Sequence, residues 1–391
     1  MEAVNGRLGT ILMTADTVGG VWTYAVELAG ALCERGVRVV LAAMGGAPSA
    51  SQREVAEAVD GLILESRPYK LEWMAEPWED VDAAGDWLLD LEKSYQPEII
   101  HLNSYAHGAL PWSAPVLVVG HSCVWSWFHA VRAETPPSSW ETYRGRIARG
   151  LASADVVAAP TRAMLSQLRS HYGELPSPRV VYNARRTDCL VPLPREDFVI
   201  TAGRLWDEAK NTNVLDVAAK SIEWPVFAAG AVQNPDGGAV GFESVKLLGE
   251  LSPSDLGRWM GRASIYALPA KYEPFGLTAL EAAHAGCALV LGDISSLREI
   301  WQDAAVFVPP NDSHALSEAV NRLIGDRRHL NEMAARAEGK AAEFTLERMT
   351  AAYLGIYAGM LSTLSYTGRD RPPSTAVGQV PSSKSFDKMT T

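Results

Sequence analysis

The chain of 391 residues carries 46 acidic and 35 basic side chains, a formal net charge of −11, which argues against a nucleic-acid-binding protein. A hydrophobic content of 47% supports the cores of about two ordinary domains and excludes a disordered chain. We expect no membrane-spanning helix, because no run of about 18 apolar residues occurs. We also expect no signal peptide, because the apolar stretch LGTILMT is too short. Widely spaced cysteines are typical of reduced thiols in a cytoplasmic protein: Cys33, Cys123, Cys189 and Cys287.

A strand, a glycine turn and a helix open the chain. Residues 8–14 predict the strand, Gly19 and Gly20 lie in the turn, and an apolar helical pattern covers residues 21–34. A second strand is predicted at 37–44, and this strand–helix–strand unit predicts a parallel sheet covered by helices. Further strands are predicted at 98–103, 115–121 and 155–160, and helices at 140–152 and 161–171.

A second series of strands and helices begins near Asp197. Residues 197–203 predict its first strand, and residues 211–221 its first helix. More strands are predicted at 225–230, 244–249, 264–269, 288–293 and 304–309, and helices at 312–325, 328–341 and 344–364. Residues 184–196 contain two prolines and no periodicity, so we interpret them as a linker between two domains.

We therefore expect an α/β chain of two doubly wound domains, the first at 1–185 and the second at 197–343. Residues 365–391 are rich in Ser, Thr, Pro, Gly and Lys, which predicts a disordered tail. Ligands of such sheets bind beyond the carboxyl ends of the strands, and each motif below falls at such an end.

Two features of the first domain are candidates for ligand contact. Gly19 and Gly20 stand between the first strand and the first helix, where they would let the backbone approach an anionic ligand. An ordinary structural turn is an equal alternative, because the G-x-G-x-x-G pattern is missing. His121 closes the strand at 115–121 and would point into the cleft, although a hydrogen-bonded histidine at a sheet edge explains it as well.

The loop after the first strand of the second domain carries Arg204 and Lys210. An arginine fork and a lysine ammonium beside the start of a helix suit a diphosphate. The alternative is a pair of solvated surface cations.

The stretch KYEPFGLTALEAAHAG at 271–286 holds Glu273 and Glu281 with seven residues between them. The N–H groups of Phe275, Gly276 and Leu277 should lie at a helix N-terminus, which is an anion site. Glu281 has apolar neighbours on this helix and therefore needs a partner, which ribose hydroxyls would provide.

Twelve tryptophans are roughly double the usual number for this length. Trp125 and Trp127 follow His121 in a predicted cleft loop, where their rings could stack on a sugar. Ordinary core or lid packing is an equally good interpretation.

These motifs together resemble those of the retaining GT-B glycosyltransferases of the E-x7-E type (glycosyl transferases group 1, family 4), which have two Rossmann-like domains facing a central cleft. The resemblance covers residues 8–364 and implies that helix 344–364 crosses back onto the first domain. It implies catalytic roles for His121, Arg204, Lys210 and Glu273. It implies donor-binding roles for Gly19, Gly20, Glu250, Leu251, Phe275, Gly276, Leu277 and Glu281.

We assign Asp16, Asn103, Trp125 and Trp127 to the acceptor side of this cleft. Two departures from the family pattern stand out. The Asn-Gly that often precedes the linker is replaced by Tyr182-Asn183-Ala184-Arg185, and the Gly-Gly that commonly follows the strand near 288–292 is replaced by Ser295-Ser296.

The resemblance implies transfer of a sugar from a nucleoside diphosphate sugar to a hydroxyl of a carbohydrate, lipid-linked or small-molecule acceptor. No cofactor is expected, and no metal, since no D-x-D motif stands at a strand end. The alternatives are a sugar-nucleotide 2-epimerase on the same fold and a non-catalytic nucleotide-sugar-binding subunit. We expect a cytoplasmic location and leave open peripheral attachment to the inner membrane face, the oligomeric state, and the identity of donor and acceptor.

Overall fold

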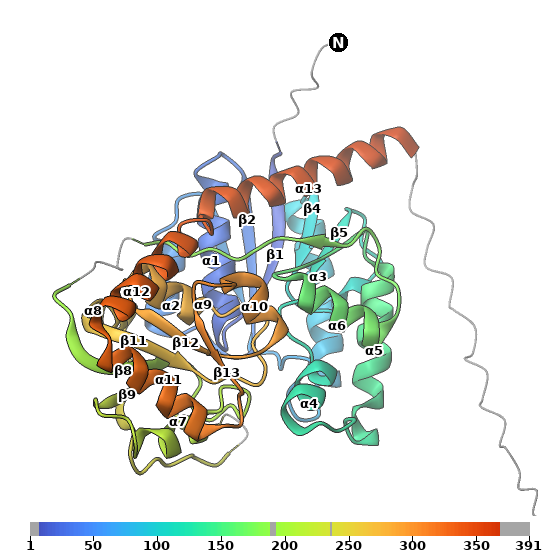
Figure 1. Cartoon of the computed structure of the whole chain (residues 1–391). Helices are drawn as coiled ribbons and strands as arrows, with labels where there is room; N and C mark the ends of the chain where they lie inside the picture. Colours follow the sequence, from blue (N-terminus) through green and yellow to red (C-terminus); the bar gives the residue numbers. More distant parts are fainter. Residues whose placement is uncertain (1–7, 188–192, 235–236, 368–391) are drawn as a thin grey trace, which may run out of the picture.

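The chain folds into two parallel sheets with helices on both faces of each, in a computed structural model that describes residues 8–187, 193–234 and 237–367 (Figure 1). The predicted linker at 184–196 therefore lies partly outside the described residues. The predicted tail at 365–391 lies outside them almost entirely, since helix α13 ends at Thr367.

The first sheet has the strand order β3-β2-β1-β4-β5-β6-β7, and all of its pairings are parallel. Leu12 of β1, for example, lies between Val40 of β2 and Ile100 of β4. This arrangement confirms the parallel sheet predicted for the first half. Its strands are β1 (Thr10–Asp16), β2 (Arg38–Met44), β3 (Leu62–Ser66), β4 (Ile99–Leu102), β5 (Val116–Val119), β6 (Val156–Ala159) and β7 (Arg179–Val180).

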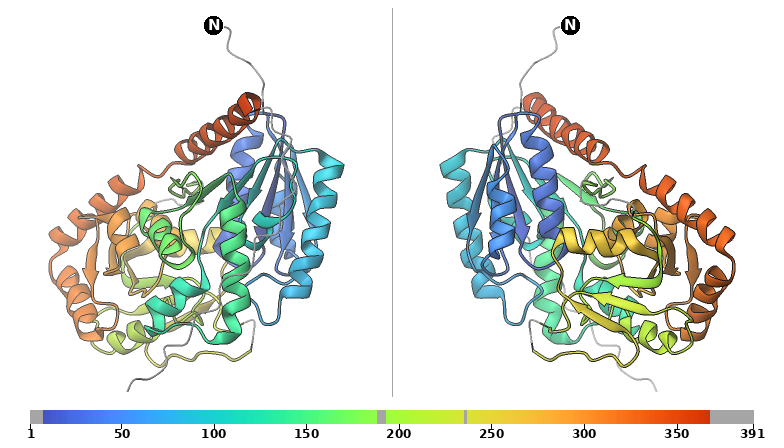
Figure 2. Two further views of the ribbon diagram at one scale, coloured as in Figure 1. Left: turned by 90° about the vertical axis from the view of Figure 1, so that its right-hand side faces the viewer. Right: turned by 90° about the vertical axis from the view of Figure 1, so that its left-hand side faces the viewer.

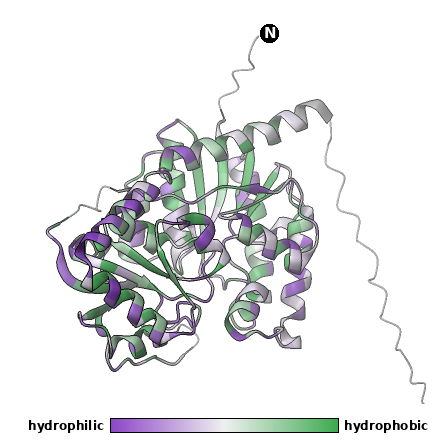
Figure 3. Cartoon of the chain, viewed as in Figure 1, coloured by the Kyte–Doolittle hydropathy of each residue, from purple (hydrophilic) through white to green (hydrophobic). Residues whose placement is uncertain are grey.

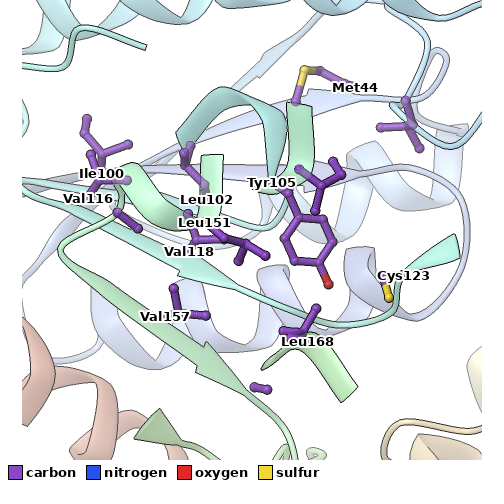
Figure 4. Packing of buried hydrophobic residues seen from close by; sticks show 14 of the residues in the cluster. Met44, Ile100, Leu102, Tyr105, Val116, Val118, Cys123, Leu151, Val157 and Leu168 are labelled. Carbon is purple, nitrogen blue, oxygen red and sulfur yellow. The ribbon is translucent and has the colours of Figure 1, made fainter. Parts of the chain in front are cut away.

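Successive residues of β1 serve two different cores, because side chains alternate across a strand. Leu12 belongs to the core on one face. Figure 4 shows Leu102, Val118 and Leu151 of the same core. Met13 packs in the core on the other face with helix α1. Both faces are covered, which explains the nearly continuous apolar run of this strand.

The helices of this half include several that the sequence prediction did not place. Its helices are α1 (Gly20–Cys33), α2 (Ala50–Glu57), α3 (Trp78–Tyr95), α4 (Val124–Arg132), α5 (Glu141–Ser153) and α6 (Arg162–Tyr172), with 3₁₀ turns η1 (Ala106–Ala109) and η2 (Ser138–Trp140). Helices α2, α3 and α4 and strands β3 and β7 are absent from the prediction. The start of α2 carried a readable signal, since Ser49 and Gln52 form a capping box.

The second sheet has the order β10-β9-β8-β11-β12-β13 and is also parallel, as predicted. Its strands are β8 (Glu196–Ala202), β9 (Val226–Ala229), β10 (Lys246–Gly249), β11 (Ala263–Leu268), β12 (Ala288–Gly292) and β13 (Val306–Val308). Its helices are α7 (Thr212–Ala219), α8 (Pro253–Arg262), α9 (Leu277–His284), α10 (Ser295–Trp301), α11 (Ser313–Gly325) and α12 (Arg327–Ala341). The strands are mainly hydrophobic and the hydrophilic residues lie mostly on helices and loops (Figure 3).

The last helix, α13 (Leu346–Thr367), leaves the second sheet and packs on α1 against the first sheet (Figure 2). Tyr353 and Tyr357 of this helix are fully buried there. Tyr357 Oη lies 2.7 Å from Nδ1 of His101, a residue of β4. Within the described part of the chain, no helix combines the length and apolar character needed to cross a membrane.

Candidate active site

Several of the predicted site residues flank the points where each sheet reverses its strand order. In the first sheet the reversal lies between β1 and β4, and in the second between β8 and β11. Open α/β sheets bind ligands beyond the carboxyl ends of the strands at such points. Asp16 ends β1 and Asn103 follows β4, while the loops that carry Arg204 and Glu273 follow β8 and β11.

The glycine turn of the first sheet contacts the loops of the second. Gly19 has a φ of 97°, and a Cβ built on it would stand 3.4 Å from Nη1 of Arg204. A Cβ built on Gly20 would stand 3.4 Å from Cδ1 of Leu277. The fold therefore brings the glycine turn, the Arg204 loop and the start of α9 together.

Arg204 is held by an aspartate that the sequence analysis missed. Its Nη2 donates to Oδ2 of Asp207 at 2.9 Å. Oδ1 of Asp207 accepts from the backbone N–H of Ala209 at 3.0 Å and from Nε1 of Trp127, on helix α4, at 3.1 Å. Burial raises the pKa of Asp207, but Arg204, Lys210 and these donors outweigh it and hold the pKa below its usual value. Asp207 thus links the guanidinium to the opposite half of the molecule.

Lys210 and Glu273, both predicted to be catalytic, form an ion pair with each other. The loop that carries Glu273 is fixed by two hydroxyl groups. Ser296 Oγ donates to the Glu273 carbonyl at 2.5 Å, and Thr161 Oγ1 donates to the Pro274 carbonyl at 3.0 Å. Ser296 is one of the residues that depart from the family pattern, and here it tethers the loop.

Helix α9 begins beside this ion pair. Phe275 is buried against Phe344, with ring centroids 5.7 Å apart, and Gly276 caps the helix with a φ of 93°. A Cβ on Gly276 would approach Leu297 Cδ2 to 3.2 Å. The first N–H groups of a helix have no partner within it and carry the positive end of its dipole. The backbone at Phe275, Gly276 and Leu277 is therefore placed to bind an anion.

Glu281 lies one turn further along α9 and is only 7% exposed. Its Oε1 is 2.5 Å from Nε of Arg185, which follows strand β7. The same guanidinium donates through Nη1 to Glu27 of helix α1. Burial raises the pKa of Glu27 to about 7, against the attraction of Arg185. The predicted need of Glu281 for a partner is therefore met within the protein by an arginine that the sequence analysis left without a role.

His121 lies between β5 and α4, with Nε2 2.8 Å from Oδ1 of Asn103. Asn103 Nδ2 donates to the Thr14 carbonyl at 2.6 Å, which turns the amide oxygen toward the histidine. Because that oxygen only accepts, Nε2 of His121 carries the ring proton. Burial lowers the pKa of His121 to about 3, so the ring is neutral at pH 7.

Asp16 lines a small cavity of about 30 Å³ together with Asn103 and Glu72. Burial raises the pKa of Asp16 to about 7, opposed by the hydrogen bond from Val18 N–H and by the charge of Arg204. Burial also raises the pKa of Glu72 to about 7. The sequence analysis did not identify Glu72, which no local pattern marks.

The two tryptophans assigned to the acceptor side have different surroundings. Both lie on helix α4 rather than in the predicted loop. Trp125 is 5% exposed and stacks on Tyr143 at a ring-centroid distance of 6.0 Å. These contacts agree with the interpretation that Trp125 is a core-packing residue. Trp127 is partly buried and reaches Asp207 across the two halves.

Glu250 and Leu251 connect strand β10 to helix α8 at the carboxyl edge of the second sheet. Glu250 is exposed, whereas Leu251 is half-buried. The carbonyl of Gly249, the last residue of β10, accepts a hydrogen bond at 2.8 Å from the N–H of Gly230, which follows the neighbouring strand β9. Glu250 and Leu251 lie at the same carboxyl edge of the sheet as Arg204 and Glu273, but beside its outermost strand, β10.

A larger cavity, of about 390 Å³, contains none of the predicted site residues. It lies where α6, α10 and the junction of α12 and α13 meet, and its charged side chains are Arg162, Glu299, Lys340, Glu343 and Arg348. Four of these belong to ion pairs: Arg162 with Glu299, and Lys340 with Glu343. We locate the candidate site by the strand ends rather than by cavity size.

Among the residues that the structure describes, no cluster of three or more His, Cys, Asp or Glu side chains is arranged to hold a metal ion.

Solved structures share this architecture over nearly the whole chain. Sucrose-phosphate synthase from Thermosynechococcus elongatus superposes with a TM-score of 0.75 at 16% identity, covering 91% of this chain and 100% of that one. Anabaena HepE, in complex with UDP and glucose, superposes with a TM-score of 0.70 at 14% identity, covering 90% and 100%. With its two parallel sheets, the chain has the GT-B fold of glycosyltransferases.

Sequence comparisons identify the family. The family model described as "Glycosyl transferases group 1" matches residues 195–340, and "Glycosyltransferase Family 4" matches residues 18–188. The two glycosyltransferase models together match most of the chain, with the group 1 model on its second half, and they support a group 1 glycosyltransferase.

Curated relatives are similar over shorter stretches or at lower identity. The O-antigen chain mannosyltransferase B of Escherichia coli is 30% identical over 113 residues, which is 29% of this chain and 30% of the relative. The D-inositol 3-phosphate glycosyltransferase of Jonesia denitrificans is 22% identical over 397 residues, 87% of this chain and 91% of the relative. The stretch aligned with the first of these thus spans under a third of that enzyme.

Proposed function

We propose that this chain is a retaining, metal-independent glycosyltransferase that moves a sugar from a nucleoside diphosphate sugar to a hydroxyl of a carbohydrate, lipid-linked or small-molecule acceptor. The observation that carries the proposal is the convergence of Arg204, Lys210 and the N-terminus of α9 opposite Gly19 and Gly20. Two cations and a helix N-terminus suit a diphosphate. The fold shared with HepE, which is bound to UDP and glucose in its crystal structure, supports a nucleotide-sugar donor.

In the proposed complex the diphosphate attracts Lys210, which now pairs with Glu273. Glu273 contacts the donor sugar, and Glu281 accepts hydrogen bonds from the ribose hydroxyls. Glu250 and Leu251 lie beside the nucleobase. Their order along the edge of the second sheet, from the reversal point to β10, supports a nucleotide extended along this edge.

The proposed reaction breaks the bond between C1 of the sugar and the diphosphate oxygen, and forms a bond from the acceptor oxygen to C1 on the same face. The departing diphosphate gains negative charge, which Arg204, Lys210 and the N–H groups at the start of α9 stabilise. The proton of the acceptor hydroxyl passes to the departing phosphate oxygen. Each such stabilising group typically contributes about 3 kcal/mol in the transition state.

The acceptor side of the proposal consists of Asp16, Asn103, His121 and Trp127 at the carboxyl edge of the first sheet. His121 is neutral and its Nε2 proton is engaged by Asn103, so we propose that it lines the reacting centre rather than serving as the general base. A cytoplasmic location is also proposed. Cys33, Cys123 and Cys287 are free thiols, as expected in a reducing compartment.

A panel of UDP-, GDP- and ADP-sugars tests the donor class, with melting temperature and sugar release as readouts. A true donor raises the melting temperature by mass action. Arg204→Ala and Lys210→Ala should each lower kcat/KM by about a hundredfold, since each removes one stabilising group. Arg258→Ala and Lys220→Ala are matched controls, because these cations of the same domain pair with exposed carboxylates elsewhere. If no nucleotide sugar shifts the melting temperature, or if both site variants keep wild-type activity, the proposal fails.

A further inference from the structure

The segment Tyr182-Asn183-Ala184-Arg185 departs from the family pattern, and the structure gives its arginine a specific place. Arg185 stands between helix α1 of the first sheet and helix α9 of the second. Its Nη1 donates to Glu27, and its Nε lies 2.5 Å from Oε1 of Glu281. The three side chains are 15%, 14% and 10% exposed. One nearly buried guanidinium therefore joins one carboxylate from each half of the molecule.

Two carboxylates at low exposure need a cation close by. Removing the guanidinium would leave Glu27 and Glu281 facing each other with little water, which favours displacement of one of the two side chains. Arg185 places an opposite charge beside both carboxylates, and its Nε lies against Oε1 of Glu281. Arginine suits this position because its planar guanidinium spreads one charge over several nitrogens, so that Nη1 reaches Glu27 while Nε lies against Glu281, which the single ammonium of a lysine does not allow.

The contact with Arg185 Nε is at Oε1 of Glu281. A carboxylate offers about four lone-pair sites on its two oxygens. Two hydroxyl groups can therefore donate to the same carboxylate beside the arginine.

We infer that Arg185 is a positioning residue for the nucleotide ribose: it holds the Glu281 carboxylate oriented toward the two ribose hydroxyls, and anchors it through Glu27 to the first domain. This inference rests on the proposed function, which assigns the ribose to Glu281. It gives a role to a residue that the family pattern does not account for. It also ties the donor site to the relative position of the two domains, because Glu27 lies on α1.

The neighbouring Arg186 provides a matched control. It carries the same charge, follows in the same segment and also binds α1, through Nη2 to Glu34 at 2.6 Å. The side chain of Arg186 is 41% exposed and that of Glu34 is 58% exposed. Glu281, by contrast, forms its ion pair with Arg185. Arg186→Gln therefore repeats the charge change of Arg185→Gln, but at an ion pair with Glu34 instead of Glu281.

The experiment measures calorimetric Kd values for UDP and 2′,3′-dideoxy-UDP, with the GDP and ADP pairs alongside, on the full chain. Arg185→Gln should weaken binding of the ribose nucleotide about tenfold, as expected for hydrogen bonds to a charged group. Binding of the dideoxy nucleotide should stay within about twofold of wild type. Arg186→Gln should bind both nucleotides like wild type.

Equal weakening of both nucleotides by Arg185→Gln would show a merely structural role, and tighter binding of the ribose nucleotide would show that Arg185 occupies the ribose site; either result overturns the inference. If Arg185→Gln does not fold, Arg185→Lys takes its place and should show a smaller loss confined to the ribose nucleotide. Wild-type protein that binds none of the six nucleotides overturns the proposed function and this inference with it. Wild-type protein that binds them, combined with equal losses in the variant, overturns the inference alone.

Discussion

Asp207, which accepts a hydrogen bond from Arg204, provides a test of the proposal that Arg204 binds the diphosphate. In Asp207→Asn the side-chain oxygen should stay with its two other donors, the N–H of Ala209 and Nε1 of Trp127, so that the new amide NH₂ faces Arg204. This replaces a 2.9 Å charge-assisted hydrogen bond by two opposed donors. Such a bond is worth about 1.5–3 kcal/mol, and about 1.4 kcal/mol corresponds to a factor of ten in rate.

We expect kcat/KM for the nucleotide sugar to fall about tenfold in Asp207→Asn, toward the lower end of that range. Arg204 keeps a second contact, over the ring of Trp206 at 5.4 Å from the centroid, which should limit its displacement. The assay is steady-state transfer with the donor found in the panel, together with the melting temperature.

Asp216→Asn is the matched control for this variant. Asp216 also belongs to the second domain and also accepts backbone N–H groups, from Glu243, Ser244 and Val245. Its substitution should lower the melting temperature and leave kcat/KM near wild type. If Asp207→Asn likewise lowers the melting temperature but keeps kcat/KM within about twofold of wild type, the reasoning about Arg204 is wrong.

Two further predictions concern the turn before α9 and the end of β1. Gly276→Ala should lower the free energy of unfolding in urea by about 1–2 kcal/mol, because an alanine there has a positive φ and crowds Leu297. Gly325→Ala, which meets no atom within 4 Å, should be neutral, and equal effects of the two would contradict this account. The pKa of Asp16 is about 7 in the folded chain against 3.8 ordinarily, so the folded state binds more protons between these values and stability falls as the pH rises through them. Asp16→Asn should therefore have a higher melting temperature than wild type at pH 8 and a smaller advantage at pH 5; an advantage independent of pH would refute this.

Much of the fold was readable from the sequence because its strands are buried on both faces. Buried strands such as 8–14 and 264–269 are continuous apolar runs, and these were predicted within two residues of their ends. Strand β3 and helix α2 were missed because they are short: β3 has five half-buried residues, and α2 has eight residues with Ala56 as its buried one. Helix α3 has apolar residues at helical spacing, Val81, Ala84 and Leu88, so the sequence pattern does predict this helix, although our prediction omitted it.

The candidate site was predictable where a motif combines charge with a strand end. Arg204, Lys210, Glu273 and Glu281 were all named from such positions. Asp207 was not, although it lies between two of them, because only its contacts with Trp127 and Arg204 distinguish it from a surface aspartate.

The local sequence determines the strands and helices, the glycine turns and the charges at the strand ends, because each depends on neighbours a few residues apart. Which charge meets which is a property of the tertiary structure alone. Glu27, Arg185 and Glu281 come from α1, the segment after β7, and α9, and they meet because the two sheets pack with these elements facing each other. No spacing within the chain encodes that meeting, since it depends on the relative placement of two domains that each fold around their own core.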